Sequence, residues 1–325
     1  MTSVPQPVLA LDFGGTKLSA AVVDAVSGAF FSRVQRPTPA FQGAPASLEV
    51  IIAAGEDALE GAAAFAPHPQ AIGVSFGGPL SRDRRRVLRS MHVGAWEDFD
   101  LPDQLTRHFG LPVVMDNDAN AAALGEGKFG SGRHYSNLLY IQISTGIGAG
   151  LILNGQIYRG AGLAGEFGHT PIQPNGPVCS CGQRGCLESL TSGWAIARDG
   201  RLALAASQHD QIPGTLHSLC AGDPQNLTAR TVFEAYRLGD PVAQKIIECA
   251  VYFLSLGIAQ ASLLLDPEII ILGGGIARSS DLIRVPLEAN LERNLPPLFR
   301  NRLKIGFSTL NGDETLLGAA LLTQS

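Results

Sequence analysis

The chain has 325 residues, of which 45% are hydrophobic and 16% charged, which is typical of a folded globular protein with one large or two medium domains. Its formal net charge of −5 provides no general attraction for nucleic acid, and no uninterrupted apolar run is long enough to cross a membrane. The N-terminus lacks a basic region followed by a long apolar core, so we expect no signal peptide and a cytoplasmic protein.

The first part of the chain predicts a meander of three apolar strands joined by tight turns, followed by alternating helices and buried strands. Helices are expected over 45–66 and over 119–128, the second opening directly after Asp118. The basic run 82–86 is interpreted as a solvated loop rather than a phosphate-binding track. The expected strands cover 8–13, 18–28, 29–37, 71–78 and 111–118.

Residues 137–160 repeat the pattern of the first meander: an apolar strand, a turn of Gly and Thr, a second strand, a polar turn and a third strand. A long buried helix over 241–265, a strand over 268–272 and a final helix over 314–323 follow. The repeat predicts an α/β protein with two similar lobes facing each other across a cleft. The alternative is coincidence between two ordinary hairpins.

The turn after the first strand has the composition of a phosphate-binding site. Its glycines allow backbone N–H groups to approach an anion, its Thr and Lys add donors, and its Asp can hold Mg²⁺. The spacing is not that of a Walker A loop. The predicted nucleotide-binding residues of this turn are Asp12, Gly14, Gly15, Thr16 and Lys17.

Two further glycine segments follow buried strands. The turn 144–150, with Thr145 and Gly146, occupies the matching place in the second meander, so two turns could hold a triphosphate. The segment 273–277, with Gly274 and Gly275, follows the strand expected over 268–272 and suits a nucleotide base or ribose. Each segment alone is a weak signal, because glycine-rich turns are common.

A candidate general base lies where the strand 111–118 meets the following helix. Asp118 could take a proton from a hydroxyl, with Asn117 as a hydrogen-bond partner. The alternative is that Asp118 only caps the helix, since a carboxylate at that position often does so.

One histidine and three cysteines fall within a loop rich in Gly and Pro. His169, Cys179, Cys181 and Cys186 form a set that suits tetrahedral zinc with no position left for a catalytic water, so we expect a structural metal. The alternatives are buried thiols or a disulfide. Five cysteines in the chain rule out complete pairing into disulfides. Glu166 and Glu188 flank the cluster, which indicates the floor of a polar substrate pocket.

Taken together, these motifs resemble the ROK family (repressors, open reading frames and sugar kinases), from Leu9 to about Leu322. The turn 12–17 is similar to the family's first phosphate loop, with Phe13 where Ile is usual, and 117–126 matches its catalytic segment. The segments 165–169 and 179–188 match its sugar and zinc signature, and 273–277 resembles its adenosine loop.

The resemblance implies an actin/hexokinase-like (ribonuclease H-like) fold and ATP-dependent phosphorylation of a hexose, with glucose first among the candidates. Asp118 would be the base toward the 6-hydroxyl, and His169 would bind both zinc and sugar. The small lobe would be 1–118 plus 312–325, the large lobe 119–311, and the protein a homodimer. Contacts to the hexose are expected from Gly77, Asn117, Glu166, His169 and Glu188.

The sequence also departs from the family pattern. Residues 75–79 replace the Ala-Pro-Gly-Pro of many glucose kinases, and 89–96 lacks the usual Asn-Leu before Trp96. Both segments are expected near the sugar, so fructose, mannose or N-acetylmannosamine are alternative substrates. The family also contains sugar-responsive repressors, which carry a DNA-binding extension before the first phosphate strand. A kinase-dead sugar sensor is disfavoured, because both phosphate turns and Asp118 are intact.

Overall fold

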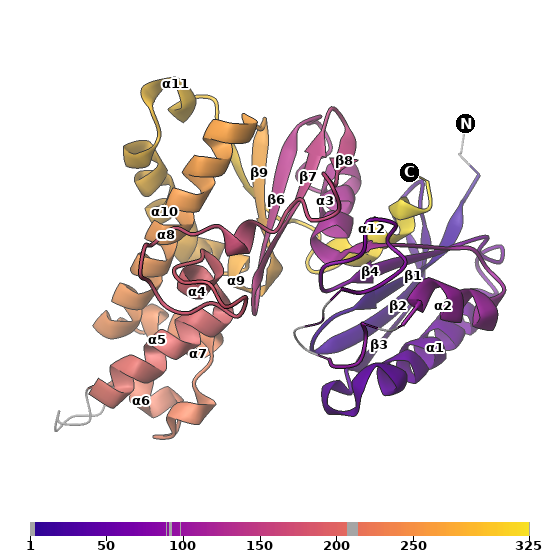
Figure 1. Ribbon diagram of the computed structural model, residues 1–325, viewed down its shortest axis with the longest axis horizontal. Coiled ribbons are helices and arrows are strands. Elements are labelled where there is room, and N and C mark those ends of the chain that lie inside the picture. Colours follow the sequence, from indigo (N-terminus) through magenta and orange to yellow (C-terminus); the bar gives the residue numbers. More distant parts are fainter. Residues whose placement is uncertain (1–3, 89, 91–92, 98, 207–213, 325) are drawn as a thin grey trace. The chain divides into compact units, whose positions relative to one another are not determined.

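The computed structural model describes residues 4–88, 90, 93–97, 99–206 and 214–324, and the chain forms two compact units (Figure 1). Unit 1 comprises Met1–Tyr140, Gly150–Gly165 and Ser308–Ser325, and unit 2 comprises Ile141–Ala149 and Glu166–Phe307. The predicted lobes, 1–118 with 312–325 and 119–311, stay a prediction, because lobes that move on ligand binding need not coincide with compact units.

The first sheet has five strands in the order β3-β2-β1-β4-β5. The meander β1-β2-β3 is antiparallel, whereas β1, β4 and β5 run parallel to one another. This register places the carboxyl ends of the three parallel strands at one edge. The strands are β1 (Pro7–Phe13), β2 (Lys17–Asp24), β3 (Phe30–Pro37), β4 (Ile72–Phe76) and β5 (Val113–Asn117).

The alternation of side chains along β1 divides the core of unit 1 into two layers. Leu9 and Leu11 contribute to the layer that packs against α1 (Gly43–Ala62) and α2 (Leu101–Phe109). Val8 and Ala10 point to the opposite face and pack against α12 (Glu314–Leu322). Because both faces are covered, the strand is apolar at nearly every position rather than alternating.

The second sheet repeats the strand order of the first. Its order, β8-β7-β6-β9-β10, is that of β3-β2-β1-β4-β5 with each strand replaced by its counterpart. The duplicated meander predicted from the sequence is therefore confirmed as a duplicated sheet topology. The strands are β6 (Leu138–Ile143), β7 (Ile147–Leu153), β8 (Gln156–Tyr158), β9 (Ile269–Gly273) and β10 (Ile305–Phe307).

Most remaining helices belong to unit 2, where α8 packs against α5, α7 and α10. By length and composition α8 could cross a membrane, but 56% of its most apolar window is buried inside the protein, as in the core helix of a soluble domain. The helices of unit 2 are η2 (Phe167–His169), α4 (Glu188–Thr191), α5 (Gly193–Ala206), α6 (Thr215–Leu219), η3 (Pro224–Asn226), α7 (Ala229–Arg237), α8 (Pro241–Leu265), α9 (Gly274–Ala277), α10 (Ser280–Asn294) and α11 (Pro297–Arg300), and unit 1 adds η1 (Ala40–Gln42).

Two sequence-based boundaries at predicted site segments need correction. The helix α3 (Asp118–Phe129) begins at Asp118, and the residue that caps it is Asn117, whose side-chain oxygen accepts from the N–H groups of Ala119 and Asn120. The expected loop 273–277 is instead the end of β9 followed by the one-turn helix α9.

Helices α3 and α12 pack closely because small residues line their contact. A Cβ atom on Gly125 would lie 2.3 Å from the carbonyl oxygen of Glu314, and one on Gly318 would lie 1.6 Å from that of Ala121. Backbone atoms occupy these positions, so neither contact can be relieved by a side-chain rotation. The placement of α3, which begins at Asp118, therefore depends on α12.

Gly125→Ala is expected to lower the free energy of unfolding by about 1–3 kcal/mol, because the added methyl group pushes α12 away from α3. The matched control is Gly127→Ala in the same helix, where the added Cβ would meet only the side chain of Leu138 at 3.5 Å. The control should be neutral, or stabilising by up to about 1 kcal/mol through helix propensity. Urea unfolding of both variants measures the difference, and equal effects would contradict the packing account.

Candidate active site

The predicted phosphate turn of unit 1 is a tight hairpin between β1 and β2. The Gly14 N–H donates to the carbonyl oxygen of Lys17 at 3.1 Å, and Thr38 Oγ1 donates to the Gly14 carbonyl at 2.8 Å. The N–H of Gly14 therefore holds the turn rather than a ligand. Thr16 and Lys17 are exposed and available to bind an anion.

Asp12 is buried at the carboxyl end of β1, at 8% exposure. Burial raises the pKa of Asp12, although hydrogen bonds from Ser75 and Thr315 and the charge of Lys17 act in the opposite direction. The Ser75 hydroxyl donates to Asp12 Oδ1 at 2.7 Å across the parallel pair β1–β4. A carboxylate held in this way is suited to a cation, which would favour its ionised form.

The candidate base stands at the same edge, at the end of β5. The Asn117 side chain donates to the Gly78 carbonyl at 3.1 Å, and this bond ties the start of α3 to the end of β4. A Cβ atom on Gly77 would lie 3.7 Å from Asp118 Oδ2, an ordinary contact distance, so Gly77 lies directly beside the carboxylate. Unit 1 thus brings Gly77, Asn117 and Asp118 close together.

A pocket opens beside these groups within unit 1. It lies between the phosphate turn and the end of β4, and aromatic side chains form its apolar wall, with the rings of Phe13 and Trp96 edge to face at 5.5 Å between centroids. The polar part of its lining comes from the turn and from hydroxyl groups. The residues lining the pocket include Gly14, Gly15, Thr38, Ser47, Gly77 and Ser90.

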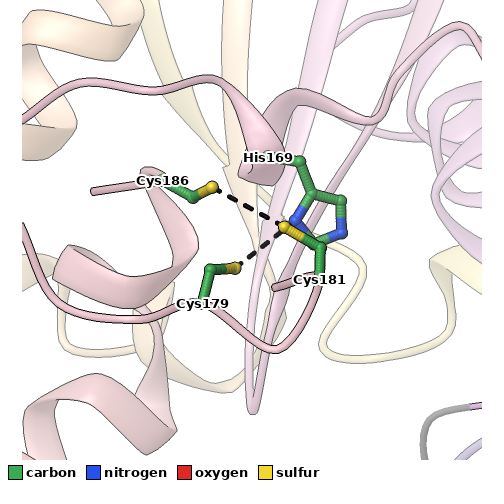
Figure 2. Close-up of side chains that lie close together, drawn as sticks. All are labelled: His169, Cys179, Cys181 and Cys186. Carbon is green, nitrogen blue, oxygen red and sulfur yellow. Dashed lines mark hydrogen bonds between the residues drawn. The ribbon is translucent and has the colours of Figure 1, made fainter. Parts of the chain in front are cut away.

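In unit 2 the four predicted metal ligands converge on one point, as Figure 2 shows. Their ligand atoms all lie within 4.8 Å of one another. His169 Nδ1 is 3.6 Å from Cys179 Sγ, and Cys181 Sγ is 3.8 Å from Cys186 Sγ. Tetrahedral thiolates at about 2.3 Å from zinc would be about 3.8 Å apart, so the spacing fits this ion.

The pKa values of the three cysteines shift in different directions. Burial, together with the neighbouring thiols of Cys181 and Cys179, raises the pKa of Cys186 to about 12, and burial raises the pKa of Cys179. Burial acts to raise the pKa of Cys181 as well, but hydrogen bonds from the Gln183 backbone and from the Cys179 and Cys186 thiols outweigh it, and the pKa of Cys181 is lowered. A divalent ion would favour the thiolate form of all three cysteines. The loop around them turns at Gly185, where φ is +70° and a Cβ atom would lie 1.7 Å from the Gln173 carbonyl.

Glu188 is fixed at both of its carboxylate oxygens. The hydroxyl of Ser180, a residue between two of the cysteines, donates to Oε1 at 2.8 Å. The backbone N–H of Ile147 donates to Oε2 at 3.0 Å. A Cβ atom on Gly146 would lie 2.6 Å from Oε2, so the glycine gives this carboxylate room. The turn containing Thr145 and Gly146 is therefore joined directly to Glu188.

Glu166 stands directly before η2, close to the imidazole of His169. Its Oε2 is 3.7 Å from His169 Nε2, while Nδ1 of the same ring faces Cys179. Nδ1 thus faces the cysteines and Nε2 faces Glu166. A histidine shared between a metal and a substrate requires its two ring nitrogens to face different partners in this way. Burial raises the pKa of Glu166, with the charge of His169 opposing and that of Glu188 adding to the shift.

Gly274, one of the two glycines predicted to bind the nucleotide base or ribose, is also required by the local backbone. Its φ is +83°, and a Cβ atom there would lie 2.5 Å from the carbonyl oxygen of Ile143. Gly275 has open space around its Cα and is accessible to a ligand.

Three residues that contact or adjoin the predicted site residues have no role predicted from the sequence. Ser75 and Ser180 each donate to a predicted site carboxylate, and Asp116 is a buried carboxylate directly before Asn117. Serine carries no signal of such a role in a sequence. The polar residue at the end of the apolar strand 111–118 is a signal that could have singled out Asp116.

The predicted residues therefore gather in two groups. Unit 1 holds the phosphate turn, Gly77, Asn117 and Asp118, and unit 2 holds Glu166, Glu188, the cysteine cluster and the segment 273–277. The departure from the family pattern at 89–96 lies partly outside the described residues, because Arg89, Met91 and His92 are not among them.

Comparison with known proteins identifies the family. Residues 8–325 match the ROK family. The chain is 33% identical to a glucokinase of Thermotoga maritima over 96% of each chain, and 35% identical to an N-acetylmannosamine kinase of Yersinia pseudotuberculosis over 96% of this chain and 97% of the relative. A ROK family glucokinase from Streptomyces griseus, solved with glucose and AMPPNP, has a TM-score of 0.84 and 33% identity, and the match covers 98% of this chain and 100% of that chain. The actin/hexokinase-like fold is confirmed, and the chain belongs to the ROK family.

Proposed function

We propose that this protein is an ATP-dependent hexose kinase that phosphorylates the 6-hydroxyl, with glucose as the preferred substrate. Similarity to glucokinases over nearly the whole chain supports the activity and the substrate. The observation that carries the proposal is the placement of Asp118 beside Gly77 and Asn117, at the strand edge that also holds Asp12. The relative named N-acetylmannosamine kinase favours that sugar as the alternative substrate.

In this proposal Asp118 accepts the proton of the attacking hydroxyl. Phosphoryl transfer needs little more acid–base chemistry than one carboxylate near the nucleophile, and the rest of catalysis is positioning and charge neutralisation. Asn117 fixes the position of Asp118, because its side chain both caps α3 and donates to the Gly78 carbonyl. The base is thereby anchored on a helix start and not on a loop.

The nucleotide contacts come from several segments in this proposal. Lys17 and Thr16 would bind phosphate oxygens from the exposed hairpin, with Gly15, Thr145 and Gly146 close to the phosphates. Asp12, with its carboxylate aligned by Ser75, would hold Mg²⁺, which neutralises phosphate charge when bound. The adenosine would lie against Gly274 and Gly275.

The proposed hexose contacts are carboxylates, an amide and an imidazole, which suit a polyol. Glu188 is the most constrained of them, since both of its oxygens already have fixed donors. The remaining contacts are Gly77, Asn117, Glu166 and His169.

We propose that zinc occupies the cluster of three cysteines and one histidine and holds the loop that carries both His169 and Glu188. The interatomic spacing and the donor set of three thiols and one imidazole support this assignment. All four ligand positions come from the protein, so the ion is structural. We further propose a cytoplasmic homodimer that does not bind nucleic acid or membranes, in keeping with the negative net charge and the mostly buried α8.

The proposed activity is tested by measuring ADP release with ATP and a panel of glucose, mannose, fructose, N-acetylmannosamine and allose. We expect the highest kcat/KM with glucose, and some turnover of mannose or fructose because the segment 75–79 departs from the glucose-kinase pattern. NMR of the product should place the phosphate on carbon 6. Phosphate on the anomeric carbon, or no turnover with any hexose, would overturn the proposal.

Asp118→Asn is expected to lower kcat by about 10²–10⁴-fold, because the amide cannot accept the proton. The amide keeps the size and most hydrogen bonds of the carboxylate, so hexose affinity measured by calorimetry should change far less. A variant that retains more than half of the wild-type kcat would show that Asp118 has no role as a base.

Cys181→Ser is expected to lower the zinc content, since a hydroxyl is a poor ligand for this site. The loop holding Glu188 and His169 would then have to be ordered on binding, which raises KM for the hexose, whereas KM for ATP should change much less. Metal analysis and kinetics on one preparation measure both effects. The matched control is Cys249→Ser, which changes a cysteine on α8 outside the cluster. Zinc-free protein with an unchanged hexose KM would mean that the metal does not support the hexose site.

A further inference from the structure

Three segments of unit 1 meet at the carboxylate of Asp116, directly before the proposed base. The side chain of Asp116 is only 4% exposed. Its Oδ2 accepts from Arg159 Nε at 2.6 Å and lies 3.8 Å from Arg84 Nη1. Asp116 belongs to β5, Arg159 directly follows β8, and Arg84 comes from the basic run 82–86, which is therefore not simply a solvated loop.

The other oxygen of Asp116 holds the start of α3. Oδ1 accepts from the backbone N–H of Asn117 at 2.8 Å and from Asn120 Nδ2 at 2.9 Å. Asp118 lies between these two donors in the chain. The carboxylate thus connects cationic side chains on one side with the first turn of α3 on the other.

Removing the Arg159 guanidinium would leave the Asp116 carboxylate without its hydrogen-bonded cation. A buried charge that loses its partner must either find another or let the surrounding structure move, which is costly when the partner was hydrogen-bonded. Arg84 is the remaining cation, but at 3.8 Å it is beyond hydrogen-bond distance. A shift of Asp116 would act on the two groups that donate to Oδ1, the Asn117 N–H and the Asn120 side chain, which flank the base.

We propose that Arg159 is a positioning residue for catalysis, acting through Asp116 on the orientation of Asn117 and Asp118. The proposal rests on the proposed function of Asp118 as the base. Arg84 adds a second, weaker contact to the same carboxylate. Arg159 also anchors its own loop, because its carbonyl oxygen accepts from the N–H groups of Gly162 at 2.8 Å and Ala164 at 3.3 Å.

The first test compares Arg159→Met with wild type. Methionine keeps the length of the aliphatic stem but removes the charge and the donors. Displacing a reacting group by about 1 Å can lower the rate about 10²-fold. We therefore expect kcat per folded protein to fall by about 10–10²-fold, with a much smaller change in KM for the hexose. Circular dichroism and zinc content normalise the rate to folded protein, so partial unfolding cannot imitate the effect. Arg159→Lys, which restores the charge without the planar guanidinium, should recover part of the lost kcat.

The matched control is Arg85→Met in the same basic run. Arg85 forms a bidentate pair with Asp100, but both side chains are partly exposed, at 52% and 32%. The substitution removes the same charge directly beside Arg84 in the chain, from a side chain that pairs with Asp100 and not with Asp116. It should leave kcat and both KM values close to those of wild type.

The second test is the double variant Asp116→Asn with Arg159→Met. It removes both charges, while the amide oxygen introduced at position 116 can still accept from Asn117 and Asn120. Its kcat should therefore be higher than that of Arg159→Met alone. Urea unfolding of wild type, the two single variants and the double variant should show that the changes in unfolding free energy are not additive. This readout does not depend on turnover.

Distinct outcomes separate the two proposals. If wild type phosphorylates a hexose but Arg159→Met keeps its normalised kcat within about twofold, Arg159 does not position the base. A loss confined to hexose KM, or a double variant no better than Arg159→Met, would also overturn the positioning role. Wild type without hexose kinase activity would overturn the proposed function itself, and the stability cycle would then report only on the ion pair.

Discussion

The parallel pairing of β1, β4 and β5 is the constraint on which the candidate site of unit 1 depends. Its register sets Asp12 opposite Ser75, and Phe76 opposite Asn117. Residues that are far apart in the sequence therefore reach one strand edge, where the chain must turn and its backbone groups are open to a ligand. Apolar side chains cover both faces of the sheet, so this edge is fixed by the core and not by the ligand.

Buried carboxylates recur in both units, and each has donors that fix its orientation. Asp12 has the Ser75 hydroxyl, Asp116 has Arg159 and the start of α3, and Glu188 has Ser180 and the Ile147 N–H. A charge removed from water needs such partners, because its desolvation is otherwise too costly. The same partners preorganise the carboxylates, so a ligand does not have to order them on binding.

Glycines near the site serve the packing of the protein at least as much as its ligands. Gly146 makes room for the Glu188 carboxylate, Gly274 for the Ile143 carbonyl and Gly125 for the backbone of α12. The sequence pattern predicts phosphate binding for Gly146 and contact with the nucleotide base or ribose for Gly274, because a glycine turn is the common signature of ligand binding and of close packing. Only the atoms facing each missing Cβ distinguish them, and those atoms come from distant parts of the chain.

The sequence by itself determined the duplicated meander, the long helix α8, the cluster of one histidine and three cysteines, and the place of Asp118 where a strand meets a helix. Each of these is carried by local periodicity or by close spacing of distinctive residues, as in the ten residues from Cys179 to Glu188. Tertiary structure decided which partners the carboxylates have and that Asn117, not Asp118, caps α3. It also placed Arg84, one residue of the arginine run, 3.8 Å from the buried carboxylate of Asp116. These features depend on strand register and on contacts between residues such as Asp116 and Arg159, 43 positions apart, and sequence periodicity does not encode them.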